Sequence, residues 1–242
     1  MNRSRKTAAV AGAVVAGMLA LPGPSAAARD GELWGAATIA PGREGIVEVA
    51  GSHGAAPGAT LTLTAPRGAR VTATPLDAPG YLGRVAADGR SGTYTVTGDA
   101  AVQGRRFPFV LAVPADAVPG TRLRDCVLLI TDAHGVRQAA GRCAVTVGLA
   151  GPTLTRPLSG VPLDVRPPIA GTAHPGARIT VRDKDDRKIC VTAAAPDGTW
   201  ACTPGPAFPA GANRLQAVAT LNGVSAMSEQ IDISVADAGA GQ

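Results

Sequence analysis

Few residues of this sequence have the types and spacing that catalysis needs. Its three histidines, His53, His134 and His174, all lie among glycines and prolines. A general base has to be held and oriented by a neighbouring group, whereas a histidine at the tip of a turn is usually only solvated. The sequence contains no G-x-S-x-G, H-E-x-x-H or phosphate-binding loop motif. We therefore predict no catalytic residues, no cofactor and no enzymatic activity.

The densest group of possible metal ligands is an acidic cluster made of Asp183, Asp185 and Asp186. Oxygen-rich loops of this kind can bind calcium. Cationic side chains are interleaved with these carboxylates between Arg182 and Lys188, and they offset the negative charge. An exposed hairpin tip explains the same residues, so we predict no metal site, and a calcium site in this loop is the alternative.

Four cysteines fall into two pairs that are close in the sequence, Cys126 with Cys143 and Cys190 with Cys202. The spacings resemble no compact zinc knuckle, and an exported protein meets an oxidising environment. Four cysteines allow three connectivities, but a proline-rich boundary separates the two pairs and favours pairing within each. We therefore predict two disulfides and no zinc.

Each cysteine pair also fits a β-hairpin. A two-residue turn at His134-Gly135, counted outward, brings Cys126 opposite Cys143 on a non-hydrogen-bonded rung, where Cα atoms lie about 4.5 Å apart. A five-residue connection over 194–198, or a shorter one with a bulge, brings Cys190 opposite Cys202. We expect each bridge to close one hairpin and to stabilise its domain by roughly 3 kcal/mol.

The N-terminus has the charge order and length of a secretory signal peptide. Three cationic residues within the first six positions precede an apolar run over 7–21, and Ala26-Ala27-Ala28 precedes the polar Arg29. The apolar run is shorter than the roughly 20 residues that span a bilayer, which disfavours a retained anchor. We predict a signal peptide over 1–28, cleavage between Ala28 and Arg29, and no membrane insertion afterwards. The protein is expected to be secreted, either free or loosely associated with the cell wall.

Charge argues against a nucleic-acid partner. The full chain carries a formal charge of +5, but residues 1–28 hold three cations and no acidic residue, so the mature protein keeps about +2. Along the sequence its arginines are scattered among acidic residues and form no continuous track for a phosphate backbone. We predict no nucleic-acid binding.

Short alternating apolar segments recur from Leu33 to Val147 and predict β-strands. They are rich in β-branched residues and are bounded by glycine, proline or aspartate. No long segment has the period of an amphipathic helix, and a strand spacing of about 8–12 residues is typical of an antiparallel sandwich. The predicted strands are 45–50, 60–64, 70–74, 93–97 and 107–113.

A proline-rich boundary indicates a second domain. Prolines recur from Pro152 to Pro168 without a strong strand between them. We interpret 150–153 as a short, stiff linker and the stretch up to Pro168 as an irregular edge strand, where a missing N–H can face solvent.

A weak internal repeat relates the two domains. Segments 55–63 and 173–181 both read A-x-P-G-A-x-[LI]-T-[LV]. In each half an Asp-Gly turn before an aromatic residue and then an x-Gly-Val turn follow in the same order. We therefore predict an all-β fold of two tandem immunoglobulin-like antiparallel β-sandwich domains, each with one intra-hairpin disulfide. The predicted domains cover 29–149 and 150–236, and a disordered tail follows over 237–242.

The second domain carries a pattern that resembles a known family. P-I-A-G-T-A-H-P-G-A-R-I-T-V over 168–181 is followed by Cys190, by D-G-T-W-A-C-T-P over 197–204 and by G-x-N-x-L-x-A-x-A-T over 211–220. Over residues 152–236 this resembles the bacterial Ig-like repeat of secreted and surface proteins, especially those of actinobacteria, including its strand-joining cysteine pair. Residues 33–149 resemble the same class only through the internal repeat.

The resemblance implies a modest role. Such repeats mostly act as spacers, stalks or adhesion modules and share no active site. One departure is Asp185-Asp186, where the family usually has a glycine turn. We predict a secreted non-catalytic spacer or interaction module whose partner is an extracellular protein or a cell-wall polymer.

Two other functions remain alternatives. A carbohydrate-binding module needs exposed aromatic platforms, for which Trp34 and Tyr81 are the freest candidates, whereas Trp200 is expected beside Cys202 in the core. An exported protease inhibitor needs a rigid loop that mimics a substrate. The segments to consider for that are Ala195-Pro196 and Val113-Pro114.

Overall fold

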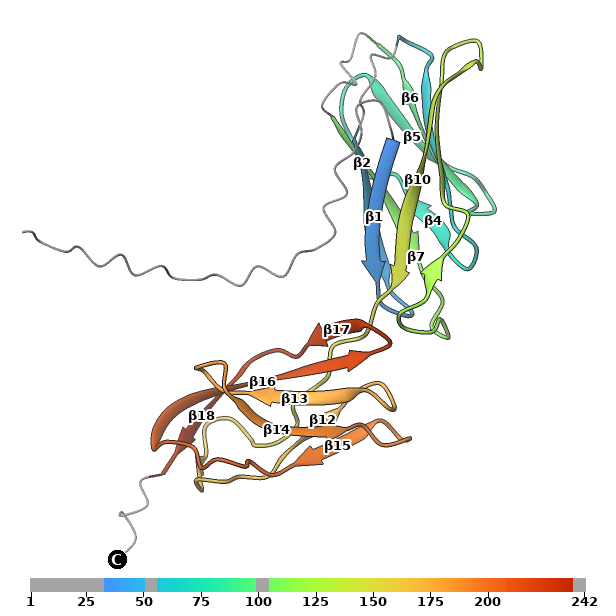
Figure 1. Ribbon diagram of the computed structural model, residues 1–242. Coiled ribbons are helices and arrows are strands. Elements are labelled where there is room, and N and C mark those ends of the chain that lie inside the picture. The colour runs from blue at the N-terminus through green and yellow to red at the C-terminus, as the bar shows by residue number, and fades with distance from the viewer. Residues whose placement is uncertain (1–32, 51–55, 99–104, 237–242) are drawn as a thin grey trace, which may run out of the picture.

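The computed structural model describes residues 33–50, 56–98 and 105–236, and all regular elements in them are β-strands (Figure 1). Within these ranges no helix is long and apolar enough to cross a membrane. The strands enclose two separate hydrophobic cores, one from Leu33 to Val147 and one from Leu149 to Val235. The prediction of two tandem Ig-like β-sandwiches is confirmed. The predicted signal peptide, its Ala28-Arg29 cleavage site, the tail over 237–242 and His53 lie outside the described residues.

The first sandwich packs a seven-stranded sheet against a three-stranded sheet. The larger sheet has the order β1-β10-β9-β3-β6-β5, with β8 paired to β10, and the smaller has the order β2-β7-β4. Strands β1 and β10 are parallel, and the other pairs are antiparallel. The bounds are β1 Leu33–Ile39, β2 Glu44–Ala50, β3 Thr60–Thr64, β4 Arg70–Ala73, β5 Tyr81–Val85, β6 Ser91–Val96, β7 Arg106–Ala112, β8 Arg122–Leu123, β9 Val127–Thr131 and β10 Arg137–Val147. Five of these agree with the predicted strands to within two residues at each end.

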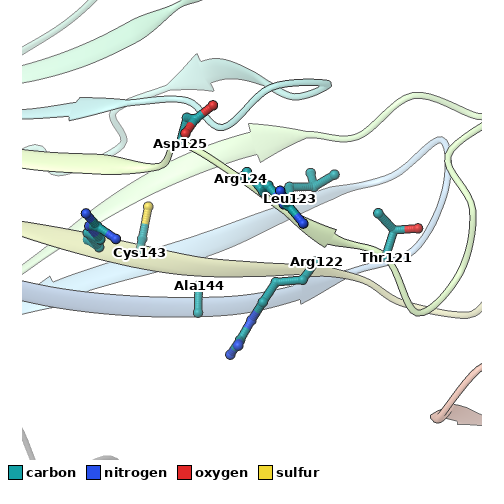
Figure 2. A pocket seen from close by; sticks show the side chains of 8 residues that line it. Thr121, Arg122, Leu123, Arg124, Asp125, Cys143 and Ala144 are labelled. Atoms are coloured by element: carbon teal, nitrogen blue, oxygen red, sulfur yellow. The ribbon is translucent and has the colours of Figure 1, made fainter.

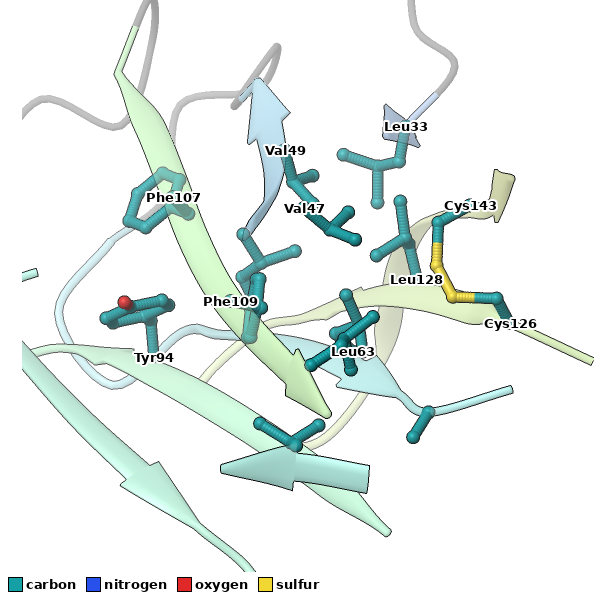
Figure 3. Close-up of a cluster of buried hydrophobic side chains, with 14 of the residues drawn as sticks. Leu33, Val47, Val49, Leu63, Tyr94, Phe107, Phe109, Cys126, Leu128 and Cys143 are labelled. Carbon is teal, nitrogen blue, oxygen red and sulfur yellow. A yellow bond between two sulfur atoms is a disulfide. The ribbon is translucent and has the colours of Figure 1, made fainter. Parts of the chain in front are cut away.

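The first core forms because every second residue of each strand points inward. Phe107 and Phe109 on β7 face Tyr94 on β6 (Figure 3), and the Tyr94 and Phe109 ring centroids lie 5.1 Å apart in an edge arrangement. The Tyr94 hydroxyl donates to the Pro108 carbonyl at 2.6 Å and accepts from the Leu76 N–H at 3.1 Å. Burial raises the pKa of Tyr94, and the Leu76 N–H partly opposes this rise. Both hydrogen bonds let a polar group lie inside an apolar layer.

The second sandwich packs a six-stranded sheet against a smaller one. The larger sheet has the order β11-β18-β16-β13-β14, with β17 paired to β16, and β12 pairs with β15 in the smaller sheet. The bounds are β11 Pro162–Leu163, β12 Ile169–Thr172, β13 Arg178–Arg182, β14 Lys188–Ala193, β15 Thr199–Cys202, β16 Gly211–Leu221, β17 Val224–Met227 and β18 Ile231–Val235. Trp200 lies in this core with 4% of its surface exposed, as expected.

The proline-spaced stretch is an irregular edge, as predicted. The N–H groups of Thr153 and Thr155 donate to carbonyls of β12 at 2.8 Å each. Further along, β11 crosses to the other sheet and pairs in parallel with β18. The prolines interrupt the ladder because they have no N–H to donate, so one segment serves both sheets in short pieces.

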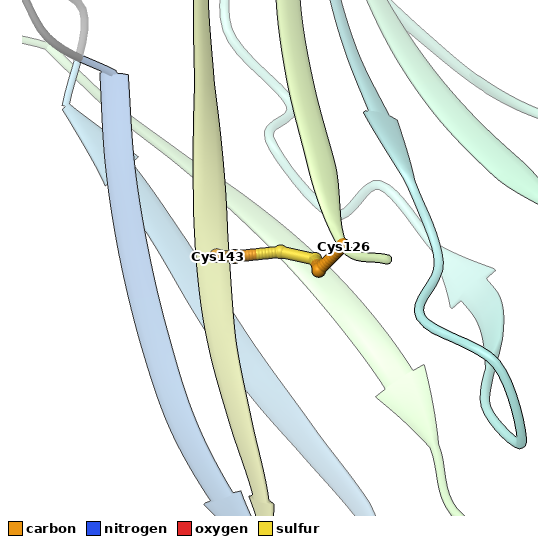
Figure 4. Close-up of a disulfide and its surroundings, with 2 residues drawn as sticks. All are labelled: Cys126 and Cys143. Atoms are coloured by element: carbon orange, nitrogen blue, oxygen red, sulfur yellow. A yellow bond between two sulfur atoms is a disulfide. The ribbon is translucent and has the colours of Figure 1, made fainter. Parts of the chain in front are cut away.

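The disulfide Cys126–Cys143 joins neighbouring strands of one sheet, β10 and the residue before β9 (Figure 4). The predicted two-residue turn is wrong, because Asp132 and not Ala133 pairs with Val136. A register shift between Arg137 and Ala139 then restores the predicted alignment of the cysteines. This bulge also changes the type of pair that the cysteines form. The pair is hydrogen-bonded and not non-hydrogen-bonded as predicted, because the Cys143 N–H donates to the Cys126 carbonyl at 3.4 Å and the Cα atoms lie 5.2 Å apart.

The disulfide Cys190–Cys202 does not close a hairpin, and that prediction is wrong. Strand β14 pairs with β13, whereas β15 pairs with β12 in the other sheet. The connection over 194–198 therefore carries the chain between sheets, and the bridge spans the open edge of the sandwich with Cα atoms 6.2 Å apart. Alternation along a strand shows which residues point inward but does not show which neighbour the strand pairs with.

The internal repeat is structural only in part. Strands β3 and β13 both follow a glycine of positive φ, Gly58 and Gly176, and both lie inside the larger sheet of their sandwich. The Asp-Gly turns differ, because the turn at Asp88-Gly89 joins two paired strands and the turn at Asp197-Gly198 lies in the connection between sheets. The two domains thus share their central strands but not the connections that follow them.

Candidate functional site

The two described histidines lie in turns of different sandwiches. His134 is at the exposed tip of the β9–β10 turn. Nδ1 of His174 lies 2.9 Å from the carbonyl of Pro175 in another turn. Within the described residues, neither imidazole has a hydrogen bond to another side chain that could orient it for proton transfer.

The acidic cluster forms the tip of the β13–β14 hairpin. Oδ1 of Asp183 accepts the backbone N–H groups of Asp185 and Arg187 at 2.9 Å each. Arg182 lies 3.3 Å from the Asp186 carboxylate, and Arg187 lies 3.9 Å from that of Asp185. In the part of the chain that the structure describes, no group of three or more His, Cys, Asp or Glu side chains could hold a metal ion. The carboxylates instead order a turn.

The two proposed aromatic platforms have different positions. Tyr81 is buried with 8% exposed, and the Arg105 guanidinium lies 5.1 Å from its ring centroid, so the expectation of a free platform is wrong for Tyr81. It points inward at the start of β5 and packs edge-on against Phe107. Trp34 on β1 is 39% exposed, as a platform requires.

An open groove of about 700 Å³ lies between β10 and the segment that contains β8 (Figure 2). Three of its lining residues are arginines, Arg122, Arg124 and Arg142. In Figure 2, Arg122 and Ala144 point to one side of the sheet and Cys143 points to the other. We call this feature the arginine groove and define it by these three arginines with Asp125 and Ala144.

A bulge creates the arginine groove. Leu123 pairs with Val145, and Val127 pairs with Arg142, so residues 124–126 face only two residues of β10. Asp125 has a φ of 67°, a left-handed conformation that aspartate tolerates better than most residues. Such bulges interrupt pairing and redirect side chains, and here the chain bends away from β10 and leaves the groove open.

The charge of the arginine groove is positive. Its one carboxylate, Asp125, already pairs with Arg67 outside the groove at 2.7 Å. Arg122, Arg124 and Arg142 are exposed, and none of them makes an ion pair within the described residues. Although the arginines are scattered along the sequence, the fold brings three of them together around one groove.

Trp34 belongs to the same surface as Arg142. The two residues are direct partners in the β1–β10 ladder, and Val127 is the partner of Arg142 on the next strand. The residues next to these three, Leu33, Cys143 and Leu128, are buried in the core. Because side chains alternate between the two faces of a sheet, Trp34, Arg142 and Val127 point to the outer face. Trp34 and Val127 are 39% and 43% exposed.

The sequence contains one signal for the arginine groove, which is lost when the arginines are compared only by their spacing along the chain. Arg122 and Arg124 alternate with less polar residues, and Arg142 stands next to Cys143. Because the Cys126–Cys143 pairing fixes how the two segments align, it also predicts that Arg142 lies near residues just before Cys126. The bulge at Asp125 that opens the groove has no such signal.

The two segments considered for a protease inhibitor are not extended, exposed loops. Val113 is buried with 3% exposed, and its N–H donates to the Arg43 carbonyl. Ala195 closes a tight turn in which it accepts from the Gly198 N–H at 2.9 Å and donates to the Thr199 carbonyl at 2.8 Å. Neither segment presents the free backbone that a substrate mimic offers to a protease.

Comparisons with known proteins give a likeness of fold. No family model and no curated protein matches the chain. Among solved structures it is similar to the BSP domain of a biofilm-associated protein, at 19% identity over 86% of this chain and 30% of that one, with a TM-score of 0.30. It is also similar to BcpA, the major pilin subunit of Bacillus cereus, at 12% identity over 86% of this chain and 66% of that one, with a TM-score of 0.35.

A third similar structure is the ligand-binding domain of human OSCAR, at 13% identity over 85% of this chain and 100% of that one, with a TM-score of 0.29. The chain thus spans 30% of the biofilm-associated protein and 66% of the pilin. At these identities and scores the likenesses assign no function. The similarity of residues 152–236 to the bacterial Ig-like repeat stays a prediction.

Proposed function

We propose that this protein is a secreted, non-catalytic interaction module that acts at or near the cell surface. The observation that carries the proposal is the arginine groove beside exposed Trp34, on the outer face of a rigid sandwich. Three arginines that line one groove without an ion pair among the described residues, with an exposed indole on the neighbouring strand, are suited to contact with a partner. The two disulfides fit an extracellular setting.

The architecture supports binding in preference to chemistry. Trp34, Arg122 and Arg142 lie on paired strands that hold their backbones in place without a ligand, which lowers the entropy lost on association. Two sandwiches in series also extend the molecule, so that one of them can be held at a surface while the other stays accessible (Figure 1). The cell-wall or protein partner that the sequence predicts is kept here as part of the proposal.

Binding of the purified mature protein to cell envelopes tests the proposal. Fluorescently labelled protein should remain on envelope material from the source organism after washing at about physiological salt. The control is the same protein after unfolding by reduction in denaturant. Full recovery in the wash, with no retention on envelopes or on immobilised secreted proteins, would contradict an interaction function.

A further inference from the structure

We infer that the arginine groove, together with Trp34, binds an anionic sugar polymer whose rings carry carboxylate or phosphate groups. This inference rests on the proposed function and names the chemistry of the partner. The arginine groove supplies the cationic part of the site, and Trp34 supplies a flat apolar part on the neighbouring strand. The cationic part requires an anionic group on the ligand, and the apolar part requires a sugar ring.

The anionic character follows from the charge balance. Arg122, Arg124 and Arg142 line one groove and have no carboxylate partner among the residues that the structure describes, while Asp125 is engaged by Arg67 at 2.7 Å. Guanidinium groups are planar and match carboxylate and phosphate oxygens with two parallel hydrogen bonds. Three unpaired guanidiniums repel each other, and an anion at this place relieves that repulsion.

The sugar character follows from Trp34. Its ring is on the outer face, and its ladder partner on the next strand is Arg142. Adjacent strands lie about 4.8 Å apart, so a ring that packs flat on the indole brings its substituents within reach of the Arg142 guanidinium. The C–H face of a pyranose packs on an aromatic ring, while its carboxylate or phosphate points sideways to a cation.

The polymeric character follows from the length of the surface. Arg122 is paired with Thr146, four residues beyond Arg142 on β10. At about 3.3 Å per residue, the two arginines are separated by about 13 Å along the strand. A single sugar ring cannot contact both, whereas a chain with repeated charges can run along the groove. Each contact is exposed and therefore weak, so repetition has to supply the affinity.

Three immobilised polymers test this inference on the full mature protein. Polygalacturonate carries carboxylates on sugar rings, poly(glycerol phosphate) carries phosphodiesters without rings, and dextran has rings without charge. We expect binding to polygalacturonate that weakens at higher salt, weaker binding to poly(glycerol phosphate), which offers anions without rings, and no measurable binding to dextran. Tighter binding to poly(glycerol phosphate) than to polygalacturonate would contradict the contribution of a sugar ring packed on Trp34.

Matched variants locate the site. Combined substitutions Arg122→Gln, Arg124→Gln and Arg142→Gln should lower the affinity about tenfold or more. The control is Arg166→Gln, Arg178→Gln and Arg214→Gln, which removes the same charge from exposed positions of the second sandwich and should change the affinity less than twofold. Trp34→Ala should weaken binding to polygalacturonate about fivefold and leave binding to poly(glycerol phosphate) unchanged. Unchanged circular dichroism shows that each variant is folded.

The outcomes separate this inference from the proposed function. Equal losses in both arginine triples, or binding to duplex DNA as tight as to either polymer, would reduce the effect to net charge and overturn the inference. Retention on cell envelopes without binding to either anionic polymer would overturn the inference and leave the proposed function standing. Absence of both kinds of binding would overturn both.

Discussion

Nδ2 of Asn222 donates a hydrogen bond to the carbonyl oxygen of Pro119 at 3.0 Å, and this contact joins the two sandwiches. Asn222 is at the tip of the β16–β17 hairpin with a φ of 48°, and Pro119 precedes β8 in the first sandwich. The backbones approach closely here, since a Cβ on Gly120 would collide with the Asn222 carbonyl. The domains therefore touch at a second place besides the chain that connects them.

Asn222→Gly should loosen the arrangement of the two domains. Glycine keeps the left-handed turn but removes the amide, and a partly exposed hydrogen bond contributes about 1 kcal/mol, or about a fivefold change in the docked population. Small-angle scattering should show a broader distribution of maximum dimension, with unchanged unfolding of each sandwich. Asp186→Gly, at a turn of the second sandwich that makes no contact with Pro119, is the control. An unchanged scattering profile would show that other contacts hold the domains.

Loss of the Cys190–Cys202 bridge should affect the edge of the second sandwich more than its centre. A double Cys190→Ala and Cys202→Ala variant should lose about 3 kcal/mol by the chain-entropy model. Because β14 and β15 share no ladder, amides of β15 should also exchange faster with solvent. Hydrogen-exchange mass spectrometry on the native state measures this.

The first disulfide gives the matched comparison. A Cys126→Ala and Cys143→Ala variant should lose a similar free energy of unfolding, but β9 keeps its ladder with β10. Its β9 amides should therefore stay protected in the native state. Equal local deprotection in both variants would contradict the inter-sheet role of the second bridge.

Gly171→Ala should destabilise the second sandwich because the site has no room for a Cβ. That atom would collide with the Thr153 carbonyl and lie 2.8 Å from Cζ2 of Trp200. Overpacking of this kind costs about 1–3 kcal/mol, which thermal unfolding followed by the Trp200 indole NMR signal would measure. Gly205→Ala is the control, since the nearest atom to its Cβ is 3.7 Å away. If Gly171→Ala leaves the unfolding temperature unchanged, the proline-spaced edge moves aside at little cost in free energy.

The sequence predicted the positions of strands and the pairing of cysteines better than the sheet partner of each strand. Alternation and turn residues located β2, β3 and β7, because these signals are local. The sheet partner of β14 depends on which neighbour buries its inner face, and this is a tertiary property that spacing to Cys202 does not contain. The same limit explains Tyr81, whose burial depends on Phe107 from a strand that is distant in the sequence.

The hairpin turns could also be predicted in part from their residues. Asp186 has a φ of 60° in the β13–β14 turn, and Gly135 has a φ of 79° at the matching place of the β9–β10 turn. The departure at Asp185-Asp186 is therefore an aspartate in a glycine position, in a turn of the same hydrogen-bond pattern. The arginine groove could be predicted only in part: the alignment of Cys126 with Cys143 places Arg142 near the residues before Cys126, but the bulge at Asp125 that opens the groove has no signal in the sequence.

Asp132 should make the stability of the first sandwich depend on pH in the acid range. Hydrogen bonds from the backbone N–H groups of Val136 and His134, and from the Gln138 amide, lower the pKa of Asp132 below 3.8. Between the lowered native pKa and the unfolded value the unfolded chain binds more protons. The contribution of Asp132 is therefore complete above the unfolded pKa and is lost as the pH falls through the native pKa.

Asp132→Asn removes this titration while it keeps the shape of the side chain. Urea unfolding from neutral pH to about pH 2, followed by the Trp34 indole NMR signal, should give a gap between wild type and variant that is widest near neutrality and closes in acid. Asp116→Asn, at an exposed carboxylate without a hydrogen bond among the described residues, should give a curve parallel to wild type. A gap that stays constant with pH would mean that Asp132 stabilises the β9–β10 turn through shape and hydrogen bonding alone, without its charge.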